Sequence, residues 1–221
     1  MKRAIIIANG RMEKPPDVAS IIQKSDLIIA ADGGIHNCQA LGLQPNVIIG
    51  DLDSMSQEEL TACQSAGASV TRYPTHKDET DLELALQFAL RDGVSDVTIL
   101  GALGARWDMS FANVLLAAHP AFAGLNIRIL DGPQELVLLR AGARLQFQNR
   151  IGDLISLIPL RGDAHGIITN GLEYPLSKET LTFGSPRGVS NVIRQERAEA
   201  FLAEGLLLCI LEKHEGEYHE K

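Results

Sequence analysis

The sequence predicts an α/β protein with two domains: an N-terminal α/β domain built on a parallel sheet, and a C-terminal antiparallel domain of the β-sandwich type. Up to Asp131, short apolar runs alternate with helix-like patterns, whereas beyond Pro133 the runs are separated by Gly, Asp and Asn with little helical period. The chain has 221 residues, which is enough for two small domains with packed cores. We therefore expect domains at residues 1–133 and 134–221, joined at Gly132 and Pro133.

The expected strands of the first domain are continuously apolar, as strands covered by helices on both faces are. They are Ala4–Ala8, Leu27–Ala31, Val47–Ile49, Val70–Tyr73, Val97–Leu100 and Ile127–Leu130. The helices expected between them are Asp17–Lys24, Ile35–Leu41, Ser56–Ala66, Asp81–Arg91 and Asp108–Ala118. Such alternation of strand and helix predicts a parallel sheet with helices on both sides.

The second half of the chain is rich in strand-like segments. The stretch "ELVLLRAGARLQFQNRIGDLISLIPLRGDAHGIITNGLEYPL" offers short strands punctuated by turn residues, and "TLTFGSPRGVSNVI" and "GLLLCILE" continue the pattern. Runs of strands without helices between them predict an antiparallel, sandwich-like domain.

Composition restricts the partners and the location. A formal net charge of −8 argues against a nucleic-acid backbone as partner, since that needs clustered Lys and Arg. Cys38, Cys63 and Cys209 have no CxxC spacing, so we expect reduced thiols rather than disulfides or a zinc site. The apolar run at residues 4–8 is too short for a signal peptide, and no stretch approaches the length of a membrane span. The expected location is the cytoplasm, without a membrane partner.

Polar residues follow three of the expected strands, at the edge where an open parallel sheet binds ligands. Asp32, Gly33 and Gly34 follow the second strand, and Asp51 and Asp53 follow the third. The segment "GALGARWD" follows the fifth strand, and "THKDETDLELAL" opens the fourth helix. These segments are the candidates for a ligand site.

Asp51 and Asp53 are two acids after a buried strand, and no Lys or Arg stands beside them in the sequence. In an extended backbone, residues two apart project to the same side. Two like charges so placed repel unless a cation lies between them, and Mg²⁺ prefers carboxylate oxygens. The alternative is a solvated turn in which Ser54 or Ser56 caps the next helix, and Ser56 with Glu59 does fit a capping box.

The segment "THKDETD" has acids beside cations. Thr80 fits an N-cap that forms a capping box with Glu83, which puts Asp81 in the first helical turn, where the helix dipole favours an acid. Asp81 therefore has a purely structural alternative. Acids for a metal next to Lys77, a cation for phosphate, are also what a Mg-nucleotide site requires, and Asp78 lies in the same loop.

Two further segments have one functional and one structural interpretation each. Gly33 and Gly34 either form a turn or let the backbone approach a nucleotide closely. Arg106 has the forked donors suited to phosphate oxygens, and its alternative is a surface salt bridge with Asp108. Trp107, the only tryptophan, is expected in the core.

Taken in order, these segments resemble the thiamine pyrophosphokinase (thiamine diphosphokinase) family over almost the whole chain. The residues that carry the resemblance are Asp32-Gly33-Gly34, Gly50-Asp51-Leu52-Asp53-Ser54, Lys77-Asp78-Glu79-Thr80-Asp81, the run from Gly101 to Gly104 with Arg106, Asp108 and Asn113, then Gly171-Leu172-Glu173-Tyr174-Pro175-Leu176 and Gly188-Val189-Ser190-Asn191. Any one of these motifs is weak, but their order and spacing across both domains are specific.

The resemblance implies transfer of pyrophosphate from ATP to thiamine, which gives thiamine diphosphate and AMP. It implies ATP and Mg²⁺ in the N-terminal domain, thiamine against the β-rich domain, and a homodimer whose sites involve both chains. By position it assigns Mg²⁺ to Asp51, Asp53 and Asp81, which with Arg106 form the catalytic set. It assigns the nucleotide to Asp32, Gly33, Gly34, Lys77, Asp78, Thr80 and Arg106, and thiamine to Ser190, Asn191 and Asp108.

Three residues depart from the family's pattern: Ala105 where Gly is frequent, Met109 in place of His or Gln, and Val192 in place of Glu. Ala105 adds a methyl group near phosphate, and Met109 cannot hydrogen-bond as His or Gln would. These changes bear on substrate identity or rate. The alternatives are a related pyrophosphokinase acting on another small alcohol such as a pterin carbinol, a sugar-nucleotide transferase with a metal-binding DxD, and a non-catalytic thiamine or nucleotide sensor.

Overall fold

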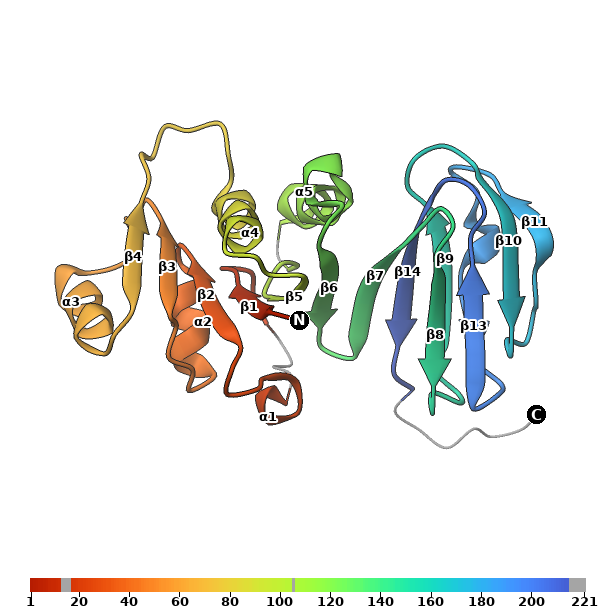
Figure 1. Cartoon of the computed structure of the whole chain (residues 1–221), viewed down its shortest axis with the longest axis horizontal. Coiled ribbons are helices and arrows are strands. Elements are labelled where there is room, and N and C mark those ends of the chain that lie inside the picture. Colours follow the sequence, from red (N-terminus) through yellow and green to blue (C-terminus); the bar gives the residue numbers. More distant parts are fainter. Residues whose placement is uncertain (13–16, 105, 215–221) are drawn as a thin grey trace. The chain divides into compact units, whose positions relative to one another are not determined.

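The computed structural model describes residues 1–12, 17–104 and 106–214 of the chain. The chain divides into two compact units, Met1–Gly132 and Pro133–Lys221. Figure 1 shows helices and strands alternating in the first unit and antiparallel strands dominating the second. The predicted fold class, a parallel α/β part followed by an antiparallel β part, is confirmed.

The first unit is built on a parallel sheet with the strand order β6-β5-β1-β2-β3-β4. Its strands are β1 (Arg3–Ile7), β2 (Leu27–Ala31), β3 (Val47–Gly50), β4 (Ser69–Arg72), β5 (Asp96–Leu100) and β6 (Asn126–Asp131). Ile6, Ile29 and Ile48 are fully buried, as expected for continuously apolar strands that helices cover on both faces. Each strand predicted for this unit is present.

Helices connect these strands: α1 (Val18–Ile21), α2 (Gly34–Ala40), α3 (Gln57–Ser65), α4 (Asp81–Arg91) and α5 (Trp107–Ala118), with a 3₁₀ turn η1 (Pro120–Phe122). The capping box predicted for α3 is present, because Ser56 Oγ accepts from Glu59 N and the Glu59 carboxylate accepts from Ser56 N. Helix α4 buries an apolar stripe against the sheet through Leu82, Ala85 and Leu86.

The first predicted helix, Asp17–Lys24, is wrong in length, since α1 ends at Ile21. Asp17 does cap its start by accepting from Ala19 N at 3.2 Å. The carbonyl of Ile21 accepts from Arg3 at 2.8 Å, and Gln23 N donates to Asp26 at 2.8 Å. One tertiary partner, Arg3, and one local partner, Asp26, thus take the hydrogen bonds that would have extended the helix.

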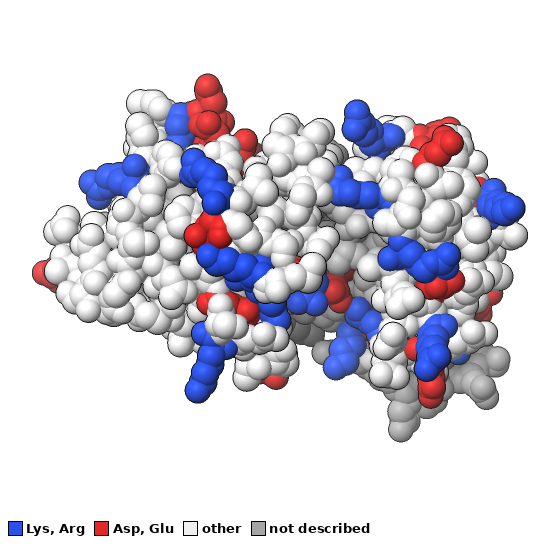
Figure 2. Space-filling model, in the orientation of Figure 1, with Lys and Arg blue, Asp and Glu red and all other residues white. Residues whose placement is uncertain are grey.

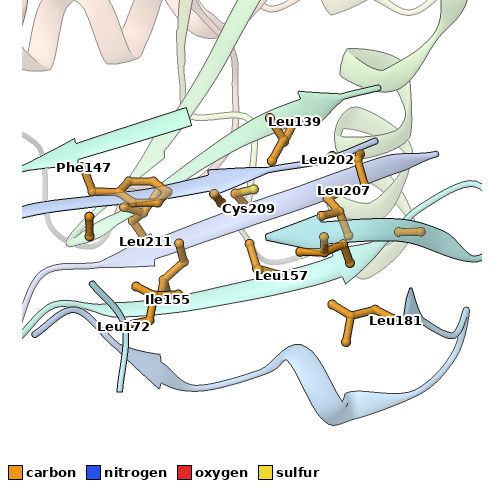
Figure 3. Packing of buried hydrophobic residues seen from close by; sticks show 14 of the residues in the cluster. Leu139, Phe147, Ile155, Leu157, Leu172, Leu181, Leu202, Leu207, Cys209 and Leu211 are labelled. Carbon is orange, nitrogen blue, oxygen red and sulfur yellow. The ribbon is translucent and has the colours of Figure 1, made fainter. Parts of the chain in front are cut away.

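The second unit has two antiparallel sheets. One has the order β12 (Asn191–Val192), β9 (Leu154–Pro159), β14 (Leu206–Glu212) and β7 (Gln134–Arg140), and the other has β11 (Ser177–Leu181), β10 (Ala164–Asn170), β13 (Arg197–Phe201) and β8 (Arg144–Gln148). A 3₁₀ turn, η2 (Pro186–Gly188), precedes β12. Leu157 and Leu207 of the first sheet share one buried cluster with Phe147 and Leu181 of the second, as Figure 3 shows. Side chains from two sheets meeting in one core are typical of a sandwich.

The three cysteines are free thiols, and each is buried. Desolvation by burial raises the pKa of Cys38 and of Cys209 to about 12. A thiol with so high a pKa is almost entirely protonated at neutral pH and is a poor nucleophile.

Basic and acidic side chains are interspersed on the face that Figure 2 draws. Several charges form exposed ion pairs, such as Lys2 with Asp92 at 2.6 Å and Arg194 with Glu173 at 2.9 Å. Such pairs contribute little to stability. Among the helices of the described ranges, none combines the length and the apolar character needed to cross a membrane.

Candidate active site

The carboxyl ends of the parallel strands meet at one edge of the first unit's sheet. The strand order reverses at β1, which has β2 on one side and β5 on the other. Ligands of open α/β sheets bind outside the carboxyl ends of the strands at such a point. The loops that leave this edge are residues 8–11, 32–34, 51–55, 73–80 and 101–104. They form the candidate active site of this unit.

Three carboxylates converge at this edge. One oxygen from each of Asp32, Asp51 and Asp53 lies within 4.8 Å of the other two. Asp32 follows β2, and the other two acids follow the neighbouring strand β3. The sequence placed Asp81 third in this group and gave Asp32 to the nucleotide, so the contribution of β2 to the acid cluster was not foreseen.

The backbone between Asp51 and Asp53 is not extended, and this part of the prediction is wrong. Leu52 has a φ of 63°, in the left-handed region. That conformation costs a non-glycine residue about 1–2 kcal/mol. The Leu52 side chain is only 3% exposed and packs in the core cluster with Ile48 and Leu60, which offsets the strain. Because Leu52 turns inward, the acids on either side of it turn outward together, and Asp53 N donates to Asp51 Oδ1 at 3.1 Å.

Asp32 is held by a close approach of two strand ends. Its φ is 43°. A Cβ added at Gly50 would lie 2.9 Å from the Cβ of Asp32, so only glycine fits there. Asp32 N donates to Ile49 O at 2.7 Å, and Ser54 Oγ donates to Asp32 Oδ1 at 3.3 Å. The Asp32 carboxylate is thereby fixed beside the turn that carries the other two acids.

The acids repel one another, and this shifts the pKa of Asp53. The charge of Asp51 is the largest cause that raises the pKa of Asp53, followed by desolvation and by the charges of Asp32 and Asp81. The pKa of Asp51 is lowered, chiefly by the hydrogen bond from Asp53 N and further by the charge of Lys77. Asp81 therefore acts on the cluster electrostatically although it is not one of the three converging oxygens.

Lys77 brings a cation to acids that have none beside them in the sequence. Its Nζ lies 3.0 Å from Asp81 Oδ1, and its side chain is 11% exposed. Nζ also donates to Pro74 O at 3.4 Å. Asp81 Oδ1 is buried and has no hydrogen-bond partner within the described part of the chain, so the Lys77 contact is an ion pair without hydrogen-bond alignment.

The start of α4 is capped as predicted. Thr80 Oγ1 accepts from Glu83 N at 3.2 Å, which is one half of the expected capping box. Asp81 follows in the first turn, where the helix dipole favours it. Asp78 is exposed on the same loop. The contacts of Asp78 and Thr80 with a nucleotide stay predictions.

Gly33 and Gly34 have a packing role in the fold. A Cβ on Gly34 would lie 2.0 Å from Ile7 O, and a Cβ on Gly33 would lie 2.3 Å from Asn9 Nδ2. The start of α2 therefore rests on the end of β1 only because these positions lack side chains. Their approach to a nucleotide stays a prediction.

Arg106 forms a forked ion pair with Asp108. Nε donates to Oδ1 at 3.1 Å and Nη2 to Oδ2 at 2.5 Å, and the two side chains are 71% and 65% exposed. The side-chain hydrogen bonds raise the pKa of Arg106 and lower that of Asp108. The structural alternative for Arg106, an ion pair with Asp108, is thus present. An ion pair so exposed is weak.

The expected core position of Trp107 is wrong, because its side chain is 88% exposed at the first turn of α5. Phe111 and Leu115 on the same helix are also exposed, at 63% and 41%. Helix α5 is apolar nearly all round, so its pattern does not distinguish the inner from the outer face. Met109 is 38% exposed. Ala105 lies outside the described residues.

The sequence prediction missed the loop 8–11, which follows β1 at the point where the strand order reverses. Gly10 N donates to Gly101 O at 2.7 Å, so this loop and the loop after β5 are joined. Asn37 of α2 holds the loop 8–11, because its Nδ2 donates to Ala8 O at 2.7 Å and to Gly10 O at 3.0 Å. Asn9, a polar residue directly after the buried strand, is the signal in the sequence that marks this loop.

Helix α5 holds the loop 101–104 in the same way. The buried Asn113 donates from Nδ2 to Ala102 O at 2.6 Å. Ser110 Oγ lies 3.1 Å from both the N and the O of Gly104. Asn113 and Ser110 therefore fix the loop that leads to Arg106.

Ser190 and Asn191 belong to the second unit. Asn191 Oδ1 accepts from Tyr174 N at 3.1 Å, and its Nδ2 donates to Tyr174 O at 2.7 Å. Ser190 has a φ of 59° and donates from its N to Ser156 Oγ at 3.1 Å. Val192, one of the three departures, is buried and belongs to β12. The segments "GLEYPL" and "GVSN" thus form one local structure, from which Tyr174 projects with 66% exposure.

Comparisons with known proteins agree across both units. The family described as "Thiamin pyrophosphokinase, catalytic domain" matches residues 18–129, and "Thiamin pyrophosphokinase, vitamin B1 binding domain" matches residues 144–207. The thiamine pyrophosphokinase of Bacillus subtilis (strain 168) is 29% identical over 210 residues, which cover 95% of this chain and 98% of that protein.

Solved structures give the same result. A crystal structure of thiamine pyrophosphokinase from Bacillus subtilis matches with a TM-score of 0.86 at 27% identity, covering 97% of this chain and 100% of that chain. The thiamin pyrophosphokinase from Geobacillus thermodenitrificans matches with a TM-score of 0.82 at 26% identity, covering 98% and 99%.

Proposed function

This chain belongs to the thiamin pyrophosphokinase family, and on that premise we propose that it transfers the pyrophosphoryl group of ATP to thiamine. The products are thiamine diphosphate and AMP. One observation carries the proposal: acids from successive strands gather with a partly buried lysine at the carboxyl edge of the sheet, in a chain that matches both domains of the family. Acids for a metal beside a cation for phosphate are the elements of a Mg-nucleotide site.

Mg²⁺ is the metal that we propose, with Asp51, Asp53 and Asp81 as its ligands and Asp32 beside them. The donors are carboxylate oxygens, which suit a hard divalent ion. Asp81 Oδ1 is a buried oxygen that lacks a hydrogen-bond partner within the described ranges, and mutual repulsion raises the pKa of Asp53. Both features fit a cation at this position. When bound, Mg²⁺ would supply positive charge that offsets the negative charge of the phosphate groups.

The protein's part in such a transfer is to orient the reactants and neutralise charge. We assign charge neutralisation to Arg106, which would exchange Asp108 for phosphate oxygens, with Lys77 in support. The thiamine hydroxyl must lie in line with the β-phosphorus, and its proton passes to a carboxylate, either Asp78 or Asp81. Asp32, as part of the segment with Gly33 and Gly34, would hold the nucleoside end that departs as AMP.

Thiamine is assigned to Ser190 and Asn191 together with Asp108. Support comes from the local structure that joins "GLEYPL" to "GVSN" around the exposed Tyr174. We propose further that the protein works in the cytoplasm as a homodimer whose sites use both chains. Loss of activity per chain on dilution, measured beside sedimentation, tests this assembly, and a fully active monomer would refute it.

A product assay tests the reaction. Protein incubated with thiamine, ATP and Mg²⁺ should give AMP and thiamine diphosphate in equal amounts. Thiamine monophosphate with ADP would mean that the acceptor faces the γ-phosphorus, and the assignment would fail. A product with a pterin carbinol alone would identify a related pyrophosphokinase, and ATP binding without any product would identify a sensor.

A further inference from the structure

Lys77 is a lysine held inside the acid site rather than extended into solvent. Its side chain is 11% exposed, whereas lysines are rarely so buried unless they are paired. Its ammonium lies 3.0 Å from Asp81 Oδ1, at the start of α4. The ammonium is thus held at the acids by a contact with the first residue of α4.

This pairing leaves the acids only partly neutralised. The ammonium does not align with Asp81 Oδ1 as a hydrogen bond, and that buried oxygen has no other partner in the ranges described. Asp53 is acted on by three like charges, from Asp51, Asp32 and Asp81. The site thus attracts cations, yet it already contains one positive charge that repels them.

We propose that Lys77 is a specificity-determining residue, which makes the site accept a divalent cation together with a nucleotide in preference to the free cation. This inference rests on the proposed Mg-ATP function. Without nucleotide, Lys77 stabilises the acids and opposes the entry of a free divalent ion. Polyphosphate oxygens can accept the hydrogen bonds of the ammonium, and Lys77 then attracts the incoming complex instead of opposing it.

The substitution Lys77→Met tests this role, because it removes the charge and retains an unbranched side chain. The probe is Mn²⁺ without nucleotide, with the free ion measured by electron paramagnetic resonance. We expect K77M to bind Mn²⁺ roughly tenfold more tightly than the wild type, the effect of one unit charge near a divalent ion. With a non-hydrolysable ATP analogue present, the order should reverse, because the variant lacks the ammonium that binds phosphate.

Thermal unfolding gives a second readout that does not depend on activity. In EDTA, K77M should melt at a lower temperature than the wild type, because the acids lose their counter-charge. Addition of Mn²⁺ alone should raise its Tm by more than it raises that of the wild type.

Two variants serve as controls. Lys77→Arg keeps the charge and should keep the weak binding of free Mn²⁺. Lys2→Met removes a lysine that is also paired with an aspartate, Asp92 at 2.6 Å, but at the opposite edge of the sheet. Lys2→Met changes the net charge of the protein by the same amount as Lys77→Met. Because Lys2 lies away from the acids, this variant should bind Mn²⁺ as the wild type does.

Mn²⁺ binding by K77M that is no tighter than that of the wild type, in the absence of nucleotide, overturns the proposal. If K77M fails to fold, a comparison of Lys77→Gln with Lys77→Arg makes the same test. Equal affinities of these two variants for free Mn²⁺ would refute the proposal. The proposed function fails separately. If the wild type makes no AMP but K77M binds Mn²⁺ more tightly than the wild type, only the proposed reaction is refuted. If the wild type makes AMP but K77M binds Mn²⁺ no more tightly, only the role of Lys77 is refuted.

Discussion

Asn191 binds both backbone groups of Tyr174, accepting from its N–H and donating to its C=O. One side-chain amide therefore clamps a residue that lies 17 positions earlier in the chain. The Tyr174 ring, which is 66% exposed, projects from a fixed backbone rather than from a free loop.

Asn191→Ala should loosen this clamp. Removing it leaves both Tyr174 backbone groups without their side-chain partner, and because these groups are exposed to water the free energy of unfolding should fall by only about 0.5–1.5 kcal/mol in urea denaturation. If Ser190 and Asn191 form the thiamine side of the site, the KM for thiamine should rise while that for ATP stays unchanged. Asn170→Ala is the matched control, since the exposed Asn170 donates from its side chain to Glu199 at 2.9 Å and its loss should change stability by less than about 0.5 kcal/mol. Equal rises in both KM values would contradict a role specific to thiamine.

At Leu52, a substitution by glycine should destabilise the fold less than a substitution by alanine, which is the reverse of the usual order. Both changes remove a buried side chain, and Leu52→Ala should cost about 2–5 kcal/mol. Glycine adopts positive φ without strain, so Leu52→Gly should be less destabilising than Leu52→Ala in urea denaturation. At Leu60, which is buried inside α3, glycine should be the worse of the two by about 1 kcal/mol. The same order at both positions would show that the left-handed backbone at Leu52 is not strained.

Asp53→Asn should separate activity from stability. It keeps the shape of the side chain and removes one negative charge from the acids, so turnover should fall by at least about 10²-fold, the scale of losing one group that stabilises the transition state. EDTA should abolish the activity of the wild type, and Mg²⁺ should restore it. The Tm of the variant in EDTA should not fall, because the substitution removes the negative charge of Asp53, which the neighbouring acids repel. Glu196→Gln, the same charge change in the second unit, should leave turnover unchanged. Normal turnover by the Asp53 variant would refute the metal assignment.

The same variant predicts a pH dependence of stability. Because neighbouring charges raise the pKa of Asp53 above its ordinary value of 3.8, its ionised form destabilises the folded, metal-free protein. This penalty is present at neutral pH and is lost as the pH falls through the raised pKa. In EDTA, Asp53→Asn should therefore melt above the wild type at pH 7, and the difference should shrink on acidification. A difference that grows on acidification would reverse the sign of the shift.

Met109→His should fold normally, because Met109 is 38% exposed. If this position lies near the acceptor, a hydrogen-bonding side chain should alter the kinetics with thiamine more than the binding of ATP. Steady-state kinetics with each substrate varied in turn makes the measurement. A large loss of stability would instead assign Met109 to core packing.

Elements that depend on contiguous residues were predictable. The apolar runs became strands because helices cover both faces of the sheet, and Ser56 and Thr80 mark helix starts because their hydroxyls satisfy free amides. The gathering of Asp51 and Asp53 was predictable from two acids after a buried strand. The backbone between them was not, since the strain at Leu52 is offset by packing against residues elsewhere in the chain.

Contacts that depend on the order of strands could not be predicted. Lys77 contacts Asp81 locally, four positions along the chain, but Asn37 reaches the loop 8–11 only because α2 rests on β1. Asp32 joined the acid cluster for the same reason, since β2 is the neighbour of β3. Trp107 was misplaced because a helix that is apolar nearly all round gives little periodic signal for its inner face.

The burial of all three thiols makes the native protein behave toward a maleimide as a cysteine-free one. Cys38, Cys63 and Cys209 are each less than a tenth exposed, and burial raises the pKa of each thiol. A single cysteine introduced at an exposed position, such as Trp107 or Tyr174, would then be the one reactive handle on the folded chain. A fluorophore attached there could report on either unit without prior removal of the native cysteines.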